Sequence, residues 1–439
     1  MSAVAVPVAP FGRPRLSTLQ QAMLSLYWFA NGAHWSAILI VLAPTQVLDI
    51  VGDATKGETL GKVVLFGAFI SMVVAPFYGA WSDRIRTRWG RRKPFLVAGT
   101  LLNTVGLLGL AYLPRSGDAS SLLPYIAAFM WVNLFNNMAT APFSALIPDA
   151  VPVEQRGAAS GWLGLMSVLG NFVGGLIGIL LGVLGIAGAY WLIIVIMLLG
   201  MSVTVLSVKE PPPPEVPSFN WGEFVRGLYT PLVKSRDFRW VFLTRFIVTL
   251  GIFTVQEFLL FYMKDVIGTF NFFGVKIADD PQGAVTYFVI ALLVGALAAS
   301  LVSGVLSDRY GRKRMVYLSG ALQGLVAAVF IFYGNYTLAI LLGVVFGVGY
   351  GAYQAVDWAL ASDVLPSAGD YARDMGVWHI AFTFPQVIAT PLAGALLDNF
   401  QALGRQIGAP NLGYSVIMTL AVVYFALGTY FVHKIRGVR

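Results

Sequence analysis

The chain has 439 residues, of which 57% are hydrophobic and 11% are charged, against about 25% charged residues in an ordinary soluble domain. This composition excludes a soluble enzyme, and the lack of cysteine excludes disulfide bonds, thiolate metal sites and a cysteine nucleophile. The net charge of +8 would suit a nucleic-acid partner in a soluble protein, but here the basic residues sort by loop, which is a signal of membrane orientation.

The apolar residues form long runs of the length that a helix needs to cross a bilayer. Backbone groups in hydrocarbon must satisfy their own hydrogen bonds, and the runs do not alternate as barrel strands do, so the sequence predicts an all-α membrane protein. The first run is too long for a cleavable signal peptide. We expect twelve transmembrane helices, at 18–48, 59–81, 93–113, 122–148, 155–183, 186–207, 238–264, 283–307, 313–333, 335–363, 370–397 and 412–434.

The longest gap between these runs is typical of a linker, because it contains Lys209-Glu-Pro-Pro-Pro-Pro-Glu215. The sequence therefore predicts an N-terminal six-helix bundle at 1–207, a cytoplasmic linker at 208–237 and a C-terminal six-helix bundle at 238–439. Most lysines and arginines fall in the loops on the side of the N-terminus. Since such loops stay in the cytoplasm, we expect a multi-pass protein of the cell membrane with both termini cytoplasmic and no nucleic-acid partner.

Two motifs recur in the same order in the two halves. Gly79-Ala-Trp-Ser-Asp-Arg84 follows helix 2 and Gly304-Val-Leu-Ser-Asp-Arg309 follows helix 8, and both continue into Gly-Arg with further basic residues. Ala145-Leu-Ile-Pro-Asp149 recurs as Ala359-Leu-Ala-Ser-Asp363. The repeat predicts two pseudo-symmetric bundles inserted the same way up, with a substrate site near the midplane between them.

The loop motif, Gly-X-X-X-Asp-Arg-X-Gly-Arg-Lys/Arg, resembles the signature of the major facilitator superfamily of secondary transporters. Within that superfamily the chain is similar to the sucrose–proton symporters and the related glycoside–cation symporters. It departs from their pattern at Asn133 and Ser144, where the family has an aspartate and an arginine, so that charge pair is absent. The similar stretches are Arg88-Trp-Gly-Arg-Arg-Lys-Pro94, Asn136-Asn137 with Pro142, Gly170-Asn171 and Pro385-Gln386.

Ionisable residues inside a membrane are costly and are therefore functional candidates. Arg245 in helix 7 and Asp357 in helix 10 share a depth at about 1.5 Å rise per residue. The resemblance implies that these helices are neighbours, so we expect a buried ion pair that either holds the bundle together or changes during turnover. Glu257 has no obvious partner at its level and is a candidate proton carrier or a structural hydrogen-bonding group.

Polar and aromatic side chains also cluster on single faces of the predicted helices. Amides can bind sugar hydroxyls and indole rings can cover the apolar face of a sugar, although asparagines also join helices and tryptophans also form interfacial belts. The resemblance implies that helices 1, 4, 7 and 10 line the cavity. The candidate substrate-binding residues are Trp28, Asn31, His34, Trp35, Asn133, Asn137, Asn171, Gln354, Trp358, His379 and Gln386.

Charged residues in the inner loops predict a cytoplasmic gate. Each basic loop would meet an acidic partner from the other half, and an aspartate ending helix 2 or 8 could also sit at the N-terminus of helix 11 or 5, where the helix dipole favours negative charge. Such contacts would favour an outward-open state. Alternatively, the basic residues only set topology. The candidate gating residues are Asp83, Arg84, Arg88, Arg91, Arg92, Asp308, Arg309, Arg312, Asp149 and Asp363.

Together these patterns predict a secondary active transporter of a small polar solute, a sugar or glycoside, that works by alternating access with proton coupling or as a facilitator. An exporter of amphipathic compounds on the same fold and a non-transporting protein for pigment handling or membrane assembly are the alternatives. No catalytic constellation or phosphate-binding loop is present, so we expect no enzyme activity, metal or cofactor. The expected partners are the solute, protons and the lipid bilayer, and the expected state is a monomer.

Overall fold

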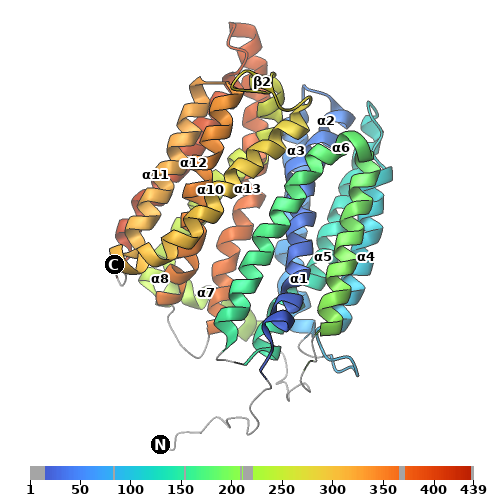
Figure 1. Ribbon diagram of the computed structural model, residues 1–439, viewed down its shortest axis with the longest axis vertical. Coiled ribbons are helices and arrows are strands. Elements are labelled where there is room, and N and C mark those ends of the chain that lie inside the picture. Colours follow the sequence, from blue (N-terminus) through green and yellow to red (C-terminus); the bar gives the residue numbers. More distant parts are fainter. Residues whose placement is uncertain are drawn as a thin grey trace, which may run out of the picture.

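The computed structural model describes residues 15–82, 85–152, 155–207, 210, 221–364 and 371–436, which are almost entirely helical (Figure 1). The first part comprises α1 (Thr18–Ser36), α2 (Ala43–Val51), α3 (Lys56–Ser82), α4 (Lys93–Tyr112), α5 (Leu122–Ala150), α6 (Arg156–Ser207) and α7 (Trp221–Lys234). The second comprises α8 (Arg236–Gln256), α9 (Leu259–Tyr262), the strands β1 (Asn271–Phe272) and β2 (Val275–Lys276), α10 (Pro281–Tyr310), α11 (Arg312–Phe332), α12 (Tyr336–Asp363), α13 (Tyr371–Ile407) and α14 (Leu412–Phe431).

These helices make the twelve membrane crossings that the sequence predicts. A π-helical turn, Ala37–Leu42, joins α1 and α2 into one crossing. The 52-residue α6 makes two, because Gly185 at φ +65° interrupts it with a backbone conformation that glycine adopts freely. By length and composition, ten segments of the described residues qualify as spans, one being the 46-residue stretch Trp162–Ser207. Helix α5, which packs against α3 and α4, completes the set.

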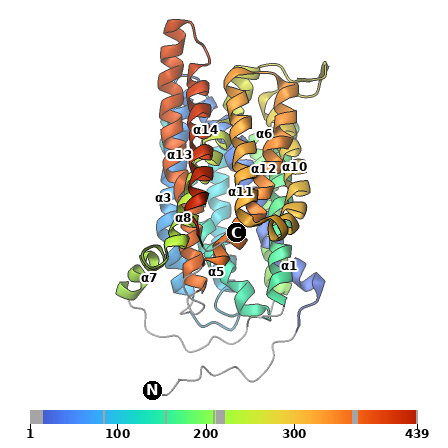
Figure 2. The ribbon, with the colours of Figure 1, turned by 90° about the vertical axis from the view of Figure 1, so that its left-hand side faces the viewer.

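The helices form two groups that stand side by side (Figures 1 and 2). Helices α1 to α6 pack on one another, with α1 along α6 and α4 along α5, while α10 packs along α12 and α14 along α8 and α11. The amphipathic linker helix α7 lies near the end of the molecule where α1 begins, beside α8 and α13. We call this end the inner end and the opposite end the outer end.

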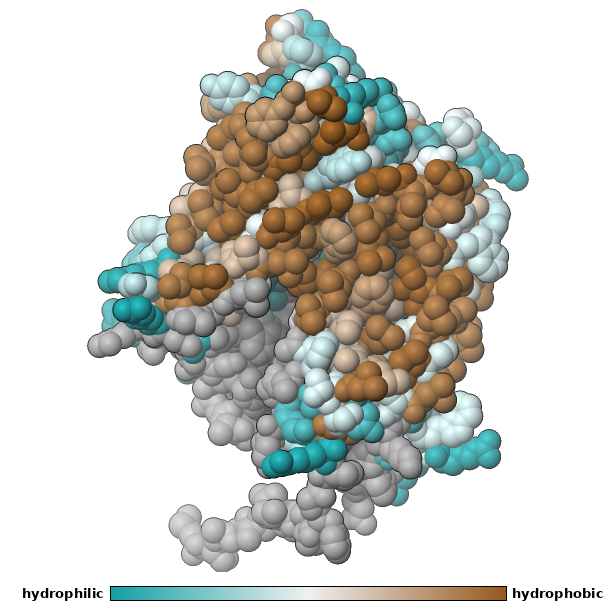
Figure 3. Space-filling model, in the orientation of Figure 1, coloured by the Kyte–Doolittle hydropathy of each residue, from teal (hydrophilic) through white to brown (hydrophobic). Residues whose placement is uncertain are grey.

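The surface between the two ends is hydrophobic. Figure 3 shows a broad brown band across one face, with hydrophilic residues gathered at the ends. Exposed aliphatic side chains near the middle of the crossings include Val105, Val195 and Val294, which are 56%, 48% and 59% exposed. A soluble monomer rarely exposes so large an apolar area, so the band marks the surface that lipid covers. The chain is therefore an integral membrane protein.

Local chemistry explains where the helices start. Asp280 accepts a hydrogen bond from the Gly283 amide, with a proline at the first position of α10, and Asn335 caps α12 through the Leu338 amide. Both are standard N-caps, because a short polar side chain satisfies an amide that the helix leaves free. Helix α13 runs to Ile407, ten residues beyond the predicted end of helix 11, and rises above its neighbours at the outer end (Figure 2).

The two groups touch along two helix pairs near the outer end. In one pair Gly57 of α3 faces Gly394 of α13, and in the other Gly178 of α6 faces Thr286 of α10. The Thr286 hydroxyl donates to the Gly175 carbonyl across this second contact, at 2.8 Å. Since glycine lets helix backbones approach closely, these contacts close the outer end between the two groups.

Candidate functional site

An amide and indole cluster joins α1 and α5 midway along the first group of helices. Asn136 of α5 donates through Nδ2 to Asn31 Oδ1 at 2.9 Å, and Trp35 Nε1 donates to Asn136 Oδ1 at 3.1 Å. Asn136 is buried, whereas Asn31 and Trp35 are half-buried. The buried amide thus fixes the orientation of an amide and an indole that stay partly accessible. We define Asn31, Trp35 and Asn136 as the amide–indole cluster.

A second set of hydrogen bonds links α3 and α5. Ser71 donates to Asn133 Oδ1 at 2.9 Å, and Asn137 Nδ2 donates to Ser71 Oγ at 2.8 Å. Asn133 also donates to the Phe129 carbonyl of its own helix. These bonds fit the reading of asparagines as helix-joining groups. Half-buried Asn137 is the better exposed of the two amides, because Asn133 is 4% exposed.

Sequence reasoning missed Asn136 and Ser71 as members of these clusters. Asn136 was visible in the Asn136-Asn137 pair that carries the family resemblance, and by helical spacing it is as close to the face of Asn133 and Thr140 as Asn137 is. Ser71 carries no sequence signal, since serine is common in membrane helices.

Two further candidate residues of the first group lie on α1 and α6. His34 is completely buried, with its ring 3.5 Å from Asn103 Nδ2 of α4. Its ring also meets the Trp35 ring edge-on, with the centroids 4.7 Å apart, so His34 lies between Trp35 and α4. Asn171 lies where α6 meets α1, and its carbonyl accepts a hydrogen bond from Ser36 Oγ at 2.9 Å.

Trp28 lies near the inner part of the same face of α1. Its ring stacks on Phe143 of α5, with the ring centroids 5.7 Å apart and the planes inclined by 10°. The ring is half-buried. It extends the aromatic surface of the amide–indole cluster toward the inner end by two helical turns from Trp35.

A buried ion pair joins α8 and α12 in the second group. Arg245 Nη1 contacts Asp357 Oδ2, and the two side chains are 8% and 3% exposed. The guanidinium lies 3.5 Å from the centroid of the Trp378 ring and 5.3 Å from that of Phe382, both on α13. The contact expected from the shared depth of the two residues is therefore present, and aromatic faces of a third helix cover the arginine.

Glu257 has a partner that sequence reasoning did not assign. Gln386 of α13 donates through Nε2 to Glu257 Oε1 at 3.1 Å, so the expectation of a carboxyl group without a partner was wrong. Glu257 is completely buried, and its Oε2 makes no hydrogen bond with the described residues. It lies at the break between α8 and α9, where Phe258 leaves the helical conformation at φ −105° and ψ 5°.

Gln354 is an exposed amide in the middle of α12. Its Nε2 donates to the hydroxyl of half-buried Tyr350 at 3.3 Å. On the helical wheel it lies roughly 140° from Leu341, which is 47% exposed on the apolar surface. A polar side chain exposed away from the apolar surface is consistent with a water-accessible space between the helices. Trp358 and His379 lie on α12 and α13, but their side chains fall outside the described part of the structure.

Those candidate gating residues that the structure describes lie at the inner end. Arg92 is 5% exposed and donates to Ser82 Oγ, while the amides of Arg91, Arg92 and Lys93 donate to the Glu210 carboxylate. Glu210 therefore holds the start of α4, where free amides favour a negative charge. Arg88 is exposed, the Arg309 guanidinium lies 5.6 Å from the Tyr310 ring, and Arg312 starts α11. Asp83 and Arg84 lie outside the described residues, as do the side chains of Asp149, Asp308 and Asp363.

Within the described residues, no group of three histidine, aspartate or glutamate side chains could hold a metal ion. The chemistry that the arrangement offers is therefore hydrogen bonding, aromatic contact and a few buried charges.

Comparison with known proteins gives one family and several relatives. Residues 54–432 match the family described as MFS/sugar transport protein. A multi-drug resistance efflux pump of Streptococcus pneumoniae is 24% identical over 91% of this chain and 93% of its own length. A glucuronide carrier protein homolog of Escherichia coli is 24% identical over 90% of this chain and 85% of its own.

The solved structures agree with the fold. A bacterial homolog of the human lysosomal transporter Spinster, in an inward-facing and unoccupied conformation, superposes with a TM-score of 0.69. The superposition covers 94% of this chain and 96% of that homolog at 14% sequence identity, which supports the shared fold alone.

Proposed function

The chain belongs to the family of MFS/sugar transport proteins, and from that premise we propose that it carries a sugar or a glycoside across the membrane by alternating access. It is a secondary transporter for a small solute and not an enzyme. Our proposal concerns the substrate class, the coupling ion and the roles of single residues.

The amide–indole cluster carries the proposal. Asn31 presents a half-buried amide beside the half-buried indole of Trp35, and buried Asn136 holds both. A sugar needs donors and acceptors for its hydroxyls together with an aromatic surface for its C–H face. From the other group of helices, exposed Gln354 and half-buried Tyr350 of α12 would add a second amide and a phenol.

Access to the site would come from the inner end in the described conformation. The close contacts of α3 with α13 and of α6 with α10 shut the outer end. The outward-facing state would then arise by rocking of one bundle against the other around the site, as parallel repeats allow. We place the inner end in the cytoplasm of a cell, with both termini there, because the loops at this end hold most of the lysines and arginines.

Proton coupling would use the buried carboxyl group of Glu257. Gln386 donates to one of its oxygens, and the other makes no hydrogen bond with the described residues, so the site has room for a proton on that oxygen. Loading or release of that proton would change the contact between α8 and α13. Arg245 lies on α8 and its partner Asp357 lies on the neighbouring helix α12. This ion pair would respond to that change.

The second candidate function is export of amphipathic compounds. The observation that favours it is the multi-drug resistance efflux pump of Streptococcus pneumoniae, which aligns over nearly all of this chain. Aromatic rings on α8 and α13, among them Phe246 and Phe384 with centroids 5.7 Å apart, would suit such a cargo. The two functions differ in which side chains matter, since an amphipathic cargo has little need of Asn31.

Binding by the purified protein tests the proposal. We would titrate the protein with monosaccharides, disaccharides and aryl glycosides and follow tryptophan fluorescence, to which Trp35 contributes. Asn31→Ala should weaken binding about tenfold, because one hydrogen bond to a ligand is worth about 1.4 kcal/mol. Asn399→Ala is the matched control, since exposed Asn399 donates to the Ala395 carbonyl of its own helix. Equal binding by both variants, or binding of amphipathic dyes alone, would reject a sugar site at Asn31.

A further inference from the structure

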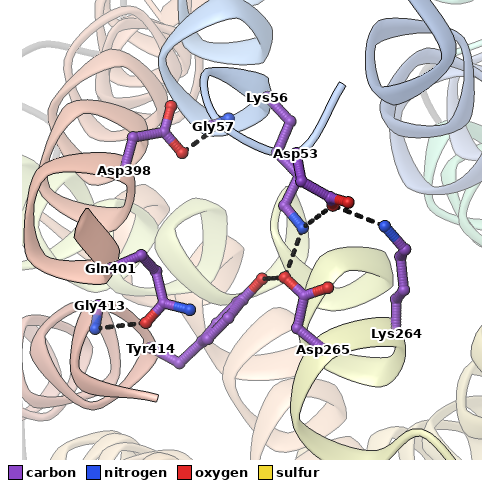
Figure 4. Close-up of polar contacts among 9 residues, drawn as sticks. All are labelled: Asp53, Lys56, Gly57, Lys264, Asp265, Asp398, Gln401, Gly413 and Tyr414. Atoms are coloured by element: carbon purple, nitrogen blue, oxygen red, sulfur yellow. Dashed lines mark hydrogen bonds and ion pairs between the residues drawn. The ribbon is translucent and has the colours of Figure 1, made fainter. Parts of the chain in front are cut away.

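A polar network joins the two bundles at the outer end (Figure 4). Lys56, at the start of α3, contacts Asp53 Oδ1 at 3.0 Å and also Asp265, which follows α9 in the second group. Lys264 crosses in the other direction and contacts Asp53 Oδ1 at 2.6 Å. The lysines and aspartates thus alternate across the junction, and each of these charged side chains contacts one of opposite charge from the other bundle.

Lys56 is the most enclosed member of this network. It is 4% exposed, and its ammonium group lies 5.0 Å from the centroid of the Phe261 ring. The hydroxyl of Tyr414, at the start of α14, donates to the same Asp265 carboxylate that contacts Lys56. A lysine enclosed in this way needs its carboxylate partners, because an unpaired buried charge is strongly unfavourable.

Asp398 of α13 makes a second kind of contact across the junction. Its Oδ1 accepts from the Gly57 amide at 3.2 Å and its Oδ2 from the Glu58 amide at 2.6 Å. These amides belong to the first turn of α3, where a helix leaves its N–H groups free and where its dipole attracts negative charge. A carboxylate of one bundle therefore caps a helix of the other bundle.

The backbone is shaped for this cap. A Cβ on Gly57 would lie 2.8 Å from Asp398 Oδ1, and a Cβ on Gly394 would collide with the Gly57 carbonyl. A Cβ on Gly61, one turn further along α3, would lie 2.7 Å from the Cα of Pro391. Glycines on both helices thus allow α13 to come close enough for its carboxylate to reach the first turn of α3.

We propose that Asp398 and the Lys56–Asp265 pair form an outer latch that holds the bundles together and is released each time the outer side opens. The proposal rests on the proposed function, since alternating access requires these contacts to break. Helices α3 and α13 run antiparallel, so the first turn of α3 lies beside the later turns of α13 at the outer end.

Distance measurement between spin labels tests the latch without any solute. The chain lacks cysteine, so Ala119→Cys and Arg405→Cys place labels on exposed outer positions of the two bundles. The parent protein in lipid nanodiscs should show mainly short distances. Asp398→Ala should raise the longer, outward-open population about tenfold, because it removes two charge-assisted hydrogen bonds.

Controls separate loss of the latch from general damage. Lys62→Gln removes a lysine from the same helix end, but its partner Glu58 lies in the same bundle at 2.6 Å, so the distances should stay as in the parent. Reversal of the crossing pair, Lys56→Asp with Asp265→Lys, should lower the longer population relative to Lys56→Asp alone. All variants should elute as one monodisperse species, which shows that they fold.

The outcomes are distinct for the two proposals. Distances unchanged by both Asp398→Ala and Lys56→Asp, in protein that is monodisperse, would overturn the latch while leaving sugar transport untouched. Failure to bind or move any sugar, with distances that lengthen as expected, would reject the substrate class and leave the latch standing.

Discussion

Removal of one partner of the Arg245–Asp357 pair should destabilise the second bundle strongly. The two side chains are 8% and 3% exposed, so neither charge can turn to water when its partner is lost. Breaking such a pair typically costs about 3–5 kcal/mol. Arg245→Ala should also lose the contact with the Trp378 ring, 3.5 Å away, which is worth about 2 kcal/mol in a desolvated site.

A double-mutant cycle measures the pair itself. We would determine the free energy of unfolding in mixed micelles for the parent, Arg245→Ala, Asp357→Ala and the double variant. Because the second substitution also removes the charge that the first leaves unpaired, the double variant should lose less than the two single variants added together, by about 2–3 kcal/mol. Lys62→Ala with Glu58→Ala gives the matched comparison. That pair is 56% and 44% exposed, and its coupling should be about 0.3–0.5 kcal/mol.

Additive losses at Arg245 and Asp357 would refute this reasoning, since they would mean that the two charges do not depend on each other. Losses below about 1 kcal/mol in each single variant would also refute it, because they would place the pair in a water-filled environment where exposed pairs contribute little.

Three further outcomes are expected. Glu257→Gln should keep solute binding and exchange but lose accumulation driven by a pH gradient in vesicles; full accumulation would show that the coupling proton travels elsewhere. Asp83→Asn with Asp308→Asn should make single cysteines placed in the inner cavity more reactive to a membrane-impermeant maleimide, and unchanged reactivity would exclude the inner gate. The hydrogen bond from Lys264 lowers the pKa of Asp53 from its ordinary value of 3.8. This contact should therefore hold the outer end closed at neutral pH and weaken only below roughly pH 4. If the spin-label distances widened between pH 7 and pH 5, and Asp53→Asn abolished that widening, the result would contradict this prediction.

Hydropathy along the chain and counts of residues along the helices predicted part of the structure. The twelve crossings come from apolar runs. The contact of Arg245 with Asp357 comes from counting residues inward from the same membrane face, together with the neighbouring of helices 7 and 10 that the family resemblance implies. The Gly185 turn inside α6 matches the gap left between the runs at 155–183 and 186–207. The crossings and the turn thus follow from composition along the chain, whereas the ion pair also needed the helix arrangement of the family.

The rest depends on helix rotation and on loops, which carry no such signal. His34 lies within one turn of Asn31 and Trp35, and its buried ring meets Asn103 of α4 as well as Trp35, because small rotations of α1 decide which neighbours a side chain meets. The outer network joins Lys56 to Asp265, 209 positions apart, and neither residue stands in a recurring motif. The last turns of α13 are polar, so hydropathy ended that helix at 397 although it continues to Ile407.

The central claim is that this family member carries a sugar or glycoside. Uptake by proteoliposomes tests this claim most directly. The purified protein would be reconstituted and offered labelled sugars, glycosides and an amphipathic cation, with and without an imposed pH gradient. The account predicts saturable uptake of at least one sugar or glycoside, which Asn31→Ala reduces and Asn399→Ala leaves unchanged. Movement of the amphipathic cation with no uptake of any sugar or glycoside would contradict it.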